Sequence, residues 1–333
     1  MKSSTWLLNR HVLAALCATP LLLGSAVVLA DEAATPAPAA AEAVTPAAAA
    51  VPAEPAPPYT LTFNLGAYTN YISRGVNNSS GPAVQGGIDW AHSSGFYLGA
   101  WFSSINPQWT GAAGSFTSVD PSGNPIGRGN HVETDWYGGY AHAFGPVTLG
   151  VGGNYVWYPE TEKSYHNRNE NTFEGNVNVS YKWFTYTFYH AFTNWYGIGN
   201  IKNDARLKQL TTPANAAADT DGVEYHEVKF NYTLPFADLN LATKVGYQRS
   251  SDICLNQKDF LIGLNRNFSL PTGGKPLDGF NAGAAYTGTF GVEECAKVSG
   301  VADGSDGRTS YYLDDNGDPV NNHMITFFIK RTW

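Results

Sequence analysis

The amino-acid sequence predicts an all-β protein, a transmembrane antiparallel β-barrel of about twelve strands in up-and-down order. Three observations favour this class. Many short segments carry large apolar side chains at every second residue, aromatic residues are as frequent as charged ones at 14% each, and no segment after residue 30 is apolar and long enough for a spanning helix. A chain that crosses lipid without helices must pair its backbone polar groups between strands, which only a closed barrel achieves.

The first thirty residues predict a secretory signal peptide. Lys2 and Arg10 precede an apolar run that ends in small residues, as such signals do. A single spanning helix is the weaker interpretation, because Pro20 and Gly24 interrupt the run. We expect cleavage after Ala30 and export from the cytoplasm.

Residues 31–58 consist mainly of Ala, Pro, Glu and Thr. Such a segment has too little apolar surface to offset the entropy of ordering it, so it predicts a disordered periplasmic tether. The tether serves as a plain spacer or reaches toward the cell wall, and residues 59–333 form the barrel. Loss of Lys2 and Arg10 with the signal changes the net charge from −8 to −10, and this sign disfavours nucleic-acid partners.

The first predicted strand runs from 59 to 73. One face carries Tyr59, Leu61, Phe63, Leu65, Ala67 and Tyr71, and the other carries Thr60, Thr62, Asn64, Gly66 and Asn70. Because successive side chains of a strand point to opposite faces, we expect the apolar face to meet lipid and the polar face to line the interior.

The same alternation recurs eleven more times along the chain, at 84–90, 96–102, 132–144, 147–157, 173–181, 186–192, 228–234, 239–247, 260–268, 280–290 and 325–333. Tight connections near 93–95, 145–146, 183 and 235–238 alternate with long ones at 106–130, 159–171, 195–221 and 291–319. Short turns are typical of the periplasmic end of outer-membrane barrels and long loops of the outer end. Twelve strands satisfy this alternation, with ten or fourteen as the alternatives.

The last predicted strand ends at Trp333, with apolar residues at every second position before it. This ending resembles the carboxyl-terminal signal by which outer-membrane barrels are delivered to the barrel-assembly machinery.

Residues 71–101 resemble the TorF-type porins, a proteobacterial family long labelled conserved hypothetical. The matching residues are Tyr71, Arg74, Gly75, Pro82, Ala83, Val84, Gln85, Gly86, Gly87, Gly95, Phe96, Tyr97, Gly99 and Trp101. Weaker matches follow at Glu133, Asp135, Tyr137, Tyr140, Tyr158, Pro159, Phe173, Glu174, Leu234, Pro235, Phe236 and Gly246. The resemblance implies an outer-membrane barrel with porin activity in a Gram-negative bacterium, and it implies no substrate and no catalytic residues.

Polar residues at inward positions are the candidates for a lumenal site. They are Arg74, Gln85, Asp89, Glu133, Asp135, Glu174, Lys182 and Lys244. One interpretation is a charged constriction in which Arg74 faces acidic residues across the lumen and orients passing solutes. The other is an internal salt-bridge cluster that braces and plugs the barrel. Strand number leaves both open, because eight strands fill with side chains and sixteen leave a channel.

Cys254 and Cys295 are the only cysteines after the signal peptide, and both fall in predicted outer loops. In an oxidising compartment such a pair predicts a disulfide, with two free thiols as the alternative.

The sequence contains no pattern that predicts an enzyme. The histidines of the mature chain occur singly with no nucleophile motif beside them, at His92, His131, His142, His166, His190, His226 and His323. We expect no cofactor and no metal. The predicted function is a porin that gives small polar solutes a passive or semi-selective path, with outer-membrane lipid as surroundings. The alternative is a plugged barrel that acts as a structural or surface-binding protein through its outer loops.

Overall fold

A computed structural model of the chain describes residues 57–79, 81–105, 131–159, 171–197, 221–236, 238–250, 256–291 and 321–333. The predicted signal peptide, almost all of the tether, and both Cys254 and Cys295 lie outside these residues. In the described part of the chain, no helix is long and apolar enough to cross a membrane.

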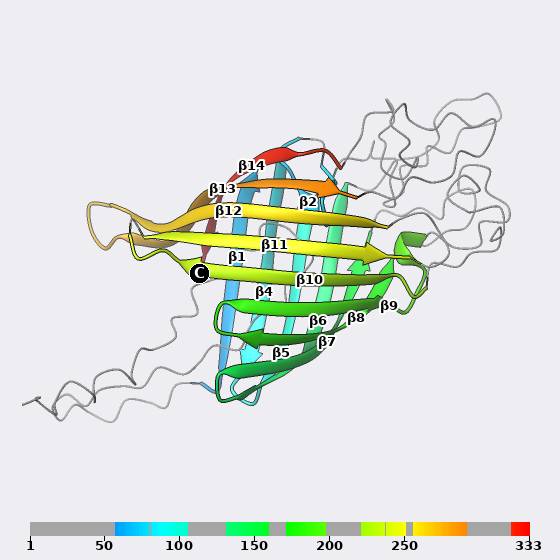
Figure 1. The fold of residues 1–333 in the computed structure, drawn as a ribbon. Helices are drawn as coiled ribbons and strands as arrows, with labels where there is room; N and C mark the ends of the chain where they lie inside the picture. Colours follow the sequence, from blue (N-terminus) through cyan, green and yellow to red (C-terminus); the bar gives the residue numbers. More distant parts are fainter. Residues whose placement is uncertain are drawn as a thin grey trace, which may run out of the picture.

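Twelve antiparallel strands close into a barrel in sequence order, with β1 paired to both β4 and β14 (Figure 1). The barrel strands are β1 (Tyr59–Tyr68), β4 (Ala83–His92), β5 (Phe96–Ser104), β6 (Val132–Phe144), β7 (Val147–Trp157), β8 (Thr172–Tyr181), β9 (Phe184–Ala191), β10 (Glu224–Thr233), β11 (Leu239–Arg249), β12 (Gln257–Leu270), β13 (Leu277–Phe290) and β14 (Met324–Thr332). Two short strands, β2 (Ile72–Ser73) and β3 (Val76–Asn77), pair only with each other, and a 3-10 helix, η1 (Trp195–Gly197), follows β9. The predicted barrel class and strand number are confirmed.

Short turns join the strands at one end of the barrel, and the last residue lies at the same end (Figure 1). The β6–β7 turn needs only Gly145 and Pro146 between its strands, and Gly145 supplies the positive φ of 61° that such a turn requires. We call this end the turn end and the opposite one the loop end.

The two faces of the barrel wall differ in polarity as the alternation predicts. On β12 the outward side chains of Ile262 and Leu264 are exposed, whereas the inward side chains of Asp259 and Asn265 are buried. The same contrast runs around the wall, so the barrel presents apolar side chains outward and polar ones inward. This inversion of the usual globular pattern is the arrangement that lipid outside and polar groups inside select.

The first strand is shorter than predicted. β1 ends at Tyr68, which pairs with Phe328 on one side and Ala83 on the other, and the chain then leaves the wall. Tyr71, predicted to face lipid, has an exposed fraction of 0% and lies inside the barrel. Its placement was wrong because the alternation continues past residue 68 into an extended hairpin, and a period-two pattern does not report where strand pairing stops.

Candidate functional site

A short hairpin inside the barrel is the centre of the candidate site. Ile72 and Ser73 pair with Asn77 and Val76, and the turn between them consists of Arg74 and Gly75. Both turn residues have positive φ, 46° for Arg74 and 80° for Gly75, as a two-residue type I′ turn requires. We call residues 71–79 the internal hairpin.

Glycine at the turn also allows the hairpin to touch the far wall. A Cβ on residue 75 would lie 2.5 Å from Cγ2 of Thr289 on β13 and 2.9 Å from Cβ of Asp259 on β12. No side chain larger than hydrogen fits that space without a shift of the wall. The tip of the hairpin is therefore in van der Waals contact with β12 and β13.

Arg74 anchors the tip to the wall opposite its origin. Its Nη1 and Nη2 donate to Oε1 and Oε2 of Glu174 on β8 at 3.0 and 2.7 Å, and both side chains are buried. The guanidinium lies 4.2 Å from the ring centroid of Tyr225 on β10. A buried, bidentate and charge-assisted pair of this kind is strong and directional.

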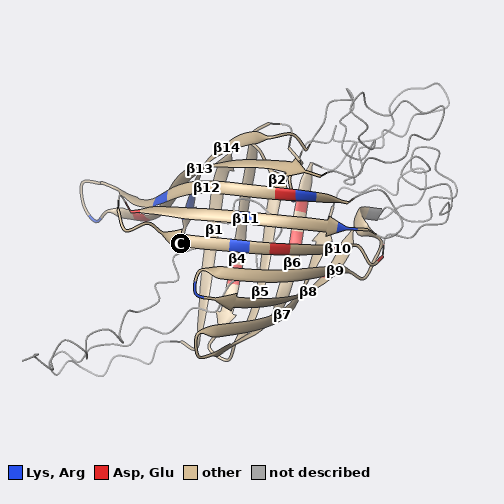
Figure 2. Cartoon of the chain, viewed as in Figure 1, with Lys and Arg blue, Asp and Glu red and all other residues tan. Residues whose placement is uncertain are grey.

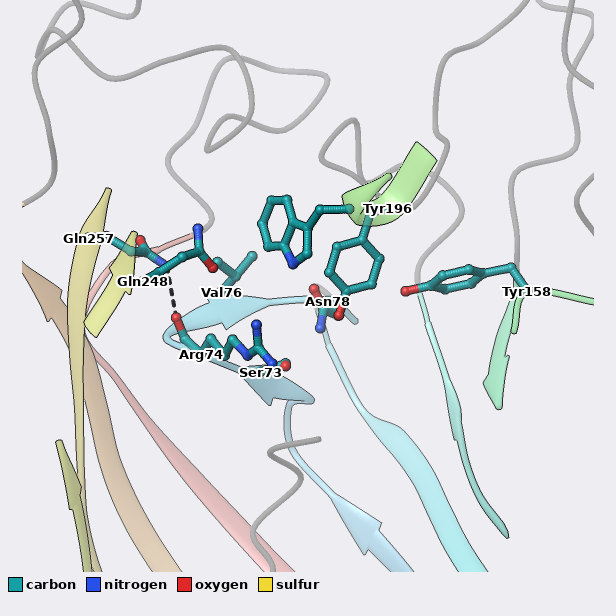
Figure 3. Close-up of a pocket in the computed structure, with 9 residues that line it drawn as sticks. Ser73, Arg74, Val76, Asn78, Tyr158, Tyr196, Gln248 and Gln257 are labelled. Carbon is teal, nitrogen blue, oxygen red and sulfur yellow. Dashed lines mark hydrogen bonds between the residues drawn. The ribbon is translucent and has the colours of Figure 1, made fainter. Parts of the chain in front are cut away.

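The backbone of the hairpin is held as well. Nε2 of Gln257 on β12 donates to the carbonyl oxygen of Arg74 at 2.9 Å, which Figure 3 shows as a dashed line. At the base, the amide of Asn78 donates to the carbonyl of Tyr71 at 2.8 Å, and Oγ of Ser79 accepts from the amide of Tyr71 at 2.8 Å.

Two tyrosines bind one carboxylate at the base of the hairpin. Tyr71 and Tyr158 donate to the two oxygens of Glu133 on β6 at 2.5 and 2.6 Å. The ring of Tyr71 also packs edge-on against Trp101 on β5, with centroids 5.3 Å apart. These contacts give both carboxylate oxygens of Glu133 a hydrogen-bond donor.

The hairpin therefore spans the lumen. It leaves the wall between β1 and β4, contacts β5 and β6 at its base, and reaches β8, β10, β12 and β13 at its tip. In the closed order of twelve strands, β9 and β10 are opposite β1 and β4. On the loop side of the hairpin a hollow of about 20 Å³ is lined by Arg74, Asn78, Tyr158, Tyr196 and Gln248, among others (Figure 3). That volume holds one or two waters and no larger solute.

A second group of charges lies on the inner wall, on the turn-end side of the internal hairpin. Lys244 on β11 contacts Asp259 on β12 at 3.0 Å, and Asp259 also accepts from the hydroxyl of Tyr225 at 3.0 Å. On β10, Lys229 contacts Glu227 at 2.7 Å. Asp89 on β4 accepts a hydrogen bond from Tyr137. In these contacts each acid has a cation or a tyrosine beside it.

Closer to the turn end, the inner faces of β10 to β13 carry a row of uncharged polar side chains. Thr233, Asn240, Asn265, Asn281 and Asn267 form a hydrogen-bonded row across β10 to β13, with donor–acceptor distances between 2.6 and 3.3 Å. Amide side chains offer both donors and acceptors without a net charge. This sector of the inner wall is therefore polar and neutral, whereas Lys330 on the neighbouring β14, the register partner of Asn281, is buried on the inner face beside it.

Most of the predicted lumenal residues lie inside the barrel. Arg74, Gln85, Glu133, Asp135, Glu174 and Lys244 are buried, and Asp89 is half-buried. The structure brings Arg74 to Glu174 and Asp135 to Asn154 at 3.2 Å, but Glu133 is paired with tyrosines rather than with Arg74.

Lys182 was placed wrongly. It lies exposed in the turn between β8 and β9, with φ of 54°, and its Nζ approaches the outward rings of Tyr181 and Trp183. The parity of a strand does not continue through a two-residue turn, so position 182 belongs to neither face.

Sequence reasoning missed Asp259, which is fully buried and contacts both Lys244 and Tyr225. The signal was partly present, because Asp259 directly precedes Phe260, the first outward residue of the strand predicted at 260–268, whereas β12 begins earlier, at Gln257. Its partners could not be foreseen, since they come from strands β10 and β11.

The fold and the site define a closed twelve-stranded β-barrel with an internal hairpin docked across its lumen. A family model described as "Bacterial protein of unknown function (Gcw_chp)" matches residues 52–314. The chain therefore belongs to this family. No curated protein matches the chain.

Several solved structures are similar to this chain at low sequence identity. Outer membrane phospholipase A from Escherichia coli has a TM-score of 0.36 and 11% identity, covering 84% of this chain and 93% of that chain. The Salmonella typhi OmpF complex with daunomycin has a TM-score of 0.35 and 7% identity, covering 83% of this chain and 97% of that chain. Pseudomonas aeruginosa OccK5 (OpdH) has a TM-score of 0.34 and 8% identity, covering 83% of this chain and 67% of that chain. At such low TM-scores these likenesses carry no argument, and the barrel rests on the strand pairing of the chain itself.

Proposed function

We propose that the protein is an outer-membrane barrel that gives small polar solutes a path through its lumen, and that the internal hairpin sets the narrowest point of that path. The observation that carries the proposal is the inverted polarity of the wall, apolar outward and polar inward. An apolar exterior matches acyl chains, and a polar interior matches water and solutes.

A hydrated lumen is supported by polar groups that the described residues leave without partners. Gln85 is buried on the inner wall, and neither its Oε1 nor its Nε2 has a hydrogen-bond partner among the described residues. Oδ1 of Asn176 and Nδ2 of Asn178 on β8 are in the same situation. Buried polar groups of this kind are normally satisfied by water or by a ligand.

A plugged barrel is the second candidate, and the docking of the internal hairpin favours it. The Arg74–Glu174 pair is buried on both sides, and the hollow above it has room only for water. In this function the barrel would be structural or would bind partners through its outer loops, and no solute would pass.

Conductance of the refolded protein in a planar bilayer distinguishes the two functions. The wild-type chain is compared with a variant in which residues 69–82 are replaced by a four-residue Gly–Ser turn. Tyr68 and Ala83 are neighbours across β1 and β4, so a short turn can join them. A path predicts discrete steps for the wild type and larger steps for the variant.

A plugged barrel predicts no conductance steps for the wild type and conductance steps for the variant without the internal hairpin. A shortened turn at 271–276, at the other end of the barrel, is the control and should leave the conductance unchanged. Silence of all three proteins, with the barrel folded, rules out the solute path.

The proposed location brings three further expectations from the sequence. Cleavage after Ala30 would deliver the barrel to a Gram-negative outer membrane, and Cys254 and Cys295 would form a disulfide there. Trp333 would serve as the signal to the barrel-assembly machinery. The role of Trp333 is supported by its backbone pairing with β1. The amide of Trp333 donates to the carbonyl of Phe63 at 2.9 Å and the amide of Phe63 to the carbonyl of Trp333 at 3.2 Å, so this residue takes part in closing the barrel.

A further inference from the structure

One sector of the outer surface differs from the rest of the apolar wall. At the loop-end halves of β9 to β12, outward positions carry His190, Glu224, His226, Arg249 and Lys258. Figure 2 shows the basic positions at the loop ends of β11 and β12. Outward positions in the loop-end halves of the other described strands carry no Lys or Arg. We call Glu224, His226, Arg249 and Lys258 the cationic patch.

Strand pairing brings the cationic patch together. Glu224 is the register partner of Arg249 and His226 that of Tyr247, while Tyr247 is in turn the partner of Lys258. The Arg249 guanidinium lies 3.8 Å from Glu224, and its side chain is 62% exposed. Two permanent cations thus face one acid, and the patch has a positive excess.

Aromatic rings hold one of these cations at the surface. Nζ of Lys258 lies 6.0 Å from the ring centroids of both Tyr247 and Phe290, at the outer limit of a cation–π contact. Such contacts orient an ammonium group and leave its hydrogen-bond donors free to meet an anion.

The surface next to the patch is apolar. Two residues from His226 toward the turn end, β10 exposes Val228, and its register partner Val245 is exposed on β11. Ile262 on β12 is exposed beyond them, still closer to the turn end. A ligand that covers both surfaces must combine an anionic group with hydrocarbon. A soluble anion would contact only the cationic patch, and a neutral lipid would contact only the apolar surface.

We propose that the cationic patch binds the phosphorylated headgroup of a lipid in the leaflet at the loop end, with the acyl chains of that lipid on Val228, Val245 and Ile262. Arg249 can donate two parallel hydrogen bonds to phosphate oxygens, and Lys258 adds a second charge. Cations at the surface of a membrane are recognised sites for anionic headgroups. The proposal rests on the membrane location given above, but not on the existence of a solute path.

Binding of diphosphoryl lipid A to the folded full-length protein, titrated by native mass spectrometry, tests the proposal. The variant Arg249→Gln/Lys258→Gln should bind this lipid about tenfold more weakly, because each cation near a membrane surface contributes substantially to headgroup attraction. Arg266→Gln/Arg331→Gln removes two outward cations at the turn end, of which Arg266 is exposed and Arg331 half-buried, and is the matched control, expected to bind as the wild type does.

Lipid A without phosphates should bind the wild type as weakly as diphosphoryl lipid A binds the first variant. Millimolar inorganic phosphate should not displace the lipid, and displacement would mean a site for free phosphate instead. Equal affinity of the wild type and the Arg249→Gln/Lys258→Gln variant would overturn the proposal. A barrel that is silent in bilayers yet binds lipid A in this phosphate-dependent way would refute the solute path alone.

Discussion

Arg74 combines a backbone requirement with an electrostatic one. Its φ of 46° forms the first half of the I′ turn, and its side chain delivers a charge to Glu174 on the opposite wall. The pair is buried, so each charge depends on the other for compensation. Loss of either partner removes a bidentate, charge-assisted contact from a buried ion.

Glu174→Gln should therefore lower the free energy of unfolding by about 3 kcal/mol, since breaking one side of a buried pair strands the other charge. Arg74→Gln should cost a similar amount, and the double variant less than the sum of the two. Urea titration in detergent micelles, followed by tryptophan fluorescence, measures the three values.

The exposed pair of Arg266 with Asp238, at 3.2 Å, is the control. Arg266→Gln should cost under about 1 kcal/mol, because water screens an exposed pair. Equal losses for Glu174→Gln and Arg266→Gln would show that the internal hairpin is not held by its buried charge.

At the scale of one element, a strand of this barrel is defined by its two faces. β7 shows it well: Leu149, Val151 and Tyr155 are exposed outward, while Asn154 and Val156 are buried inward. The residue type at each position follows from the medium that its side chain meets, and the backbone is the same throughout.

A charge placed on the outward face of β7 should destabilise the barrel in lipid. Val151→Arg, near the middle of the strand, is expected to cost about 2–4 kcal/mol. Asn64→Arg, at an inward and half-buried position of β1, should cost less because the polar lumen can hydrate the guanidinium. The measurement is the urea dependence of folding into phospholipid vesicles, and a reversed order of the two costs would contradict the assignment of faces.

The internal hairpin is an element of a different kind. It has four strand residues, too few for independent stability, and it is ordered by contacts with distant strands. Its conformation is therefore a property of the closed barrel rather than of residues 71–79.

The whole molecule is stabilised by closure. Every barrel strand has two partners, and the seam between β1 and β14 is extended by the Phe63–Trp333 pair. With no free edge, the backbone offers detergent or another chain no row of unpaired groups.

Closure predicts heat-modifiable migration in sodium dodecyl sulfate gels. The unheated folded protein should run at a different position from the boiled one, because the detergent does not open the ring of paired strands. A chain truncated before residue 324 lacks β14 and exposes two edges, so it should run at the boiled position with or without heating. Identical positions for heated and unheated full-length protein would contradict the closed barrel.

The sequence alone determined the class of this protein. Alternation at every second residue and the order of short and long connections predicted twelve strands and the polarity of each face, because these features depend on residues adjacent in the chain and on the two media that flank a strand. The inward placement of Gln85, Glu133, Asp135 and Glu174 followed from the same local rule.

Only the tertiary structure decided how the lumen is occupied. Arg74 meets a carboxylate 100 residues away, and Tyr71 turns from the expected lipid face to a buried contact with Glu133. Lys182, by contrast, leaves the lumen for an exposed turn. The placements of Arg74 and Tyr71 depend on which strands lie opposite one another once the ring is closed, and no property of neighbouring residues carries that information.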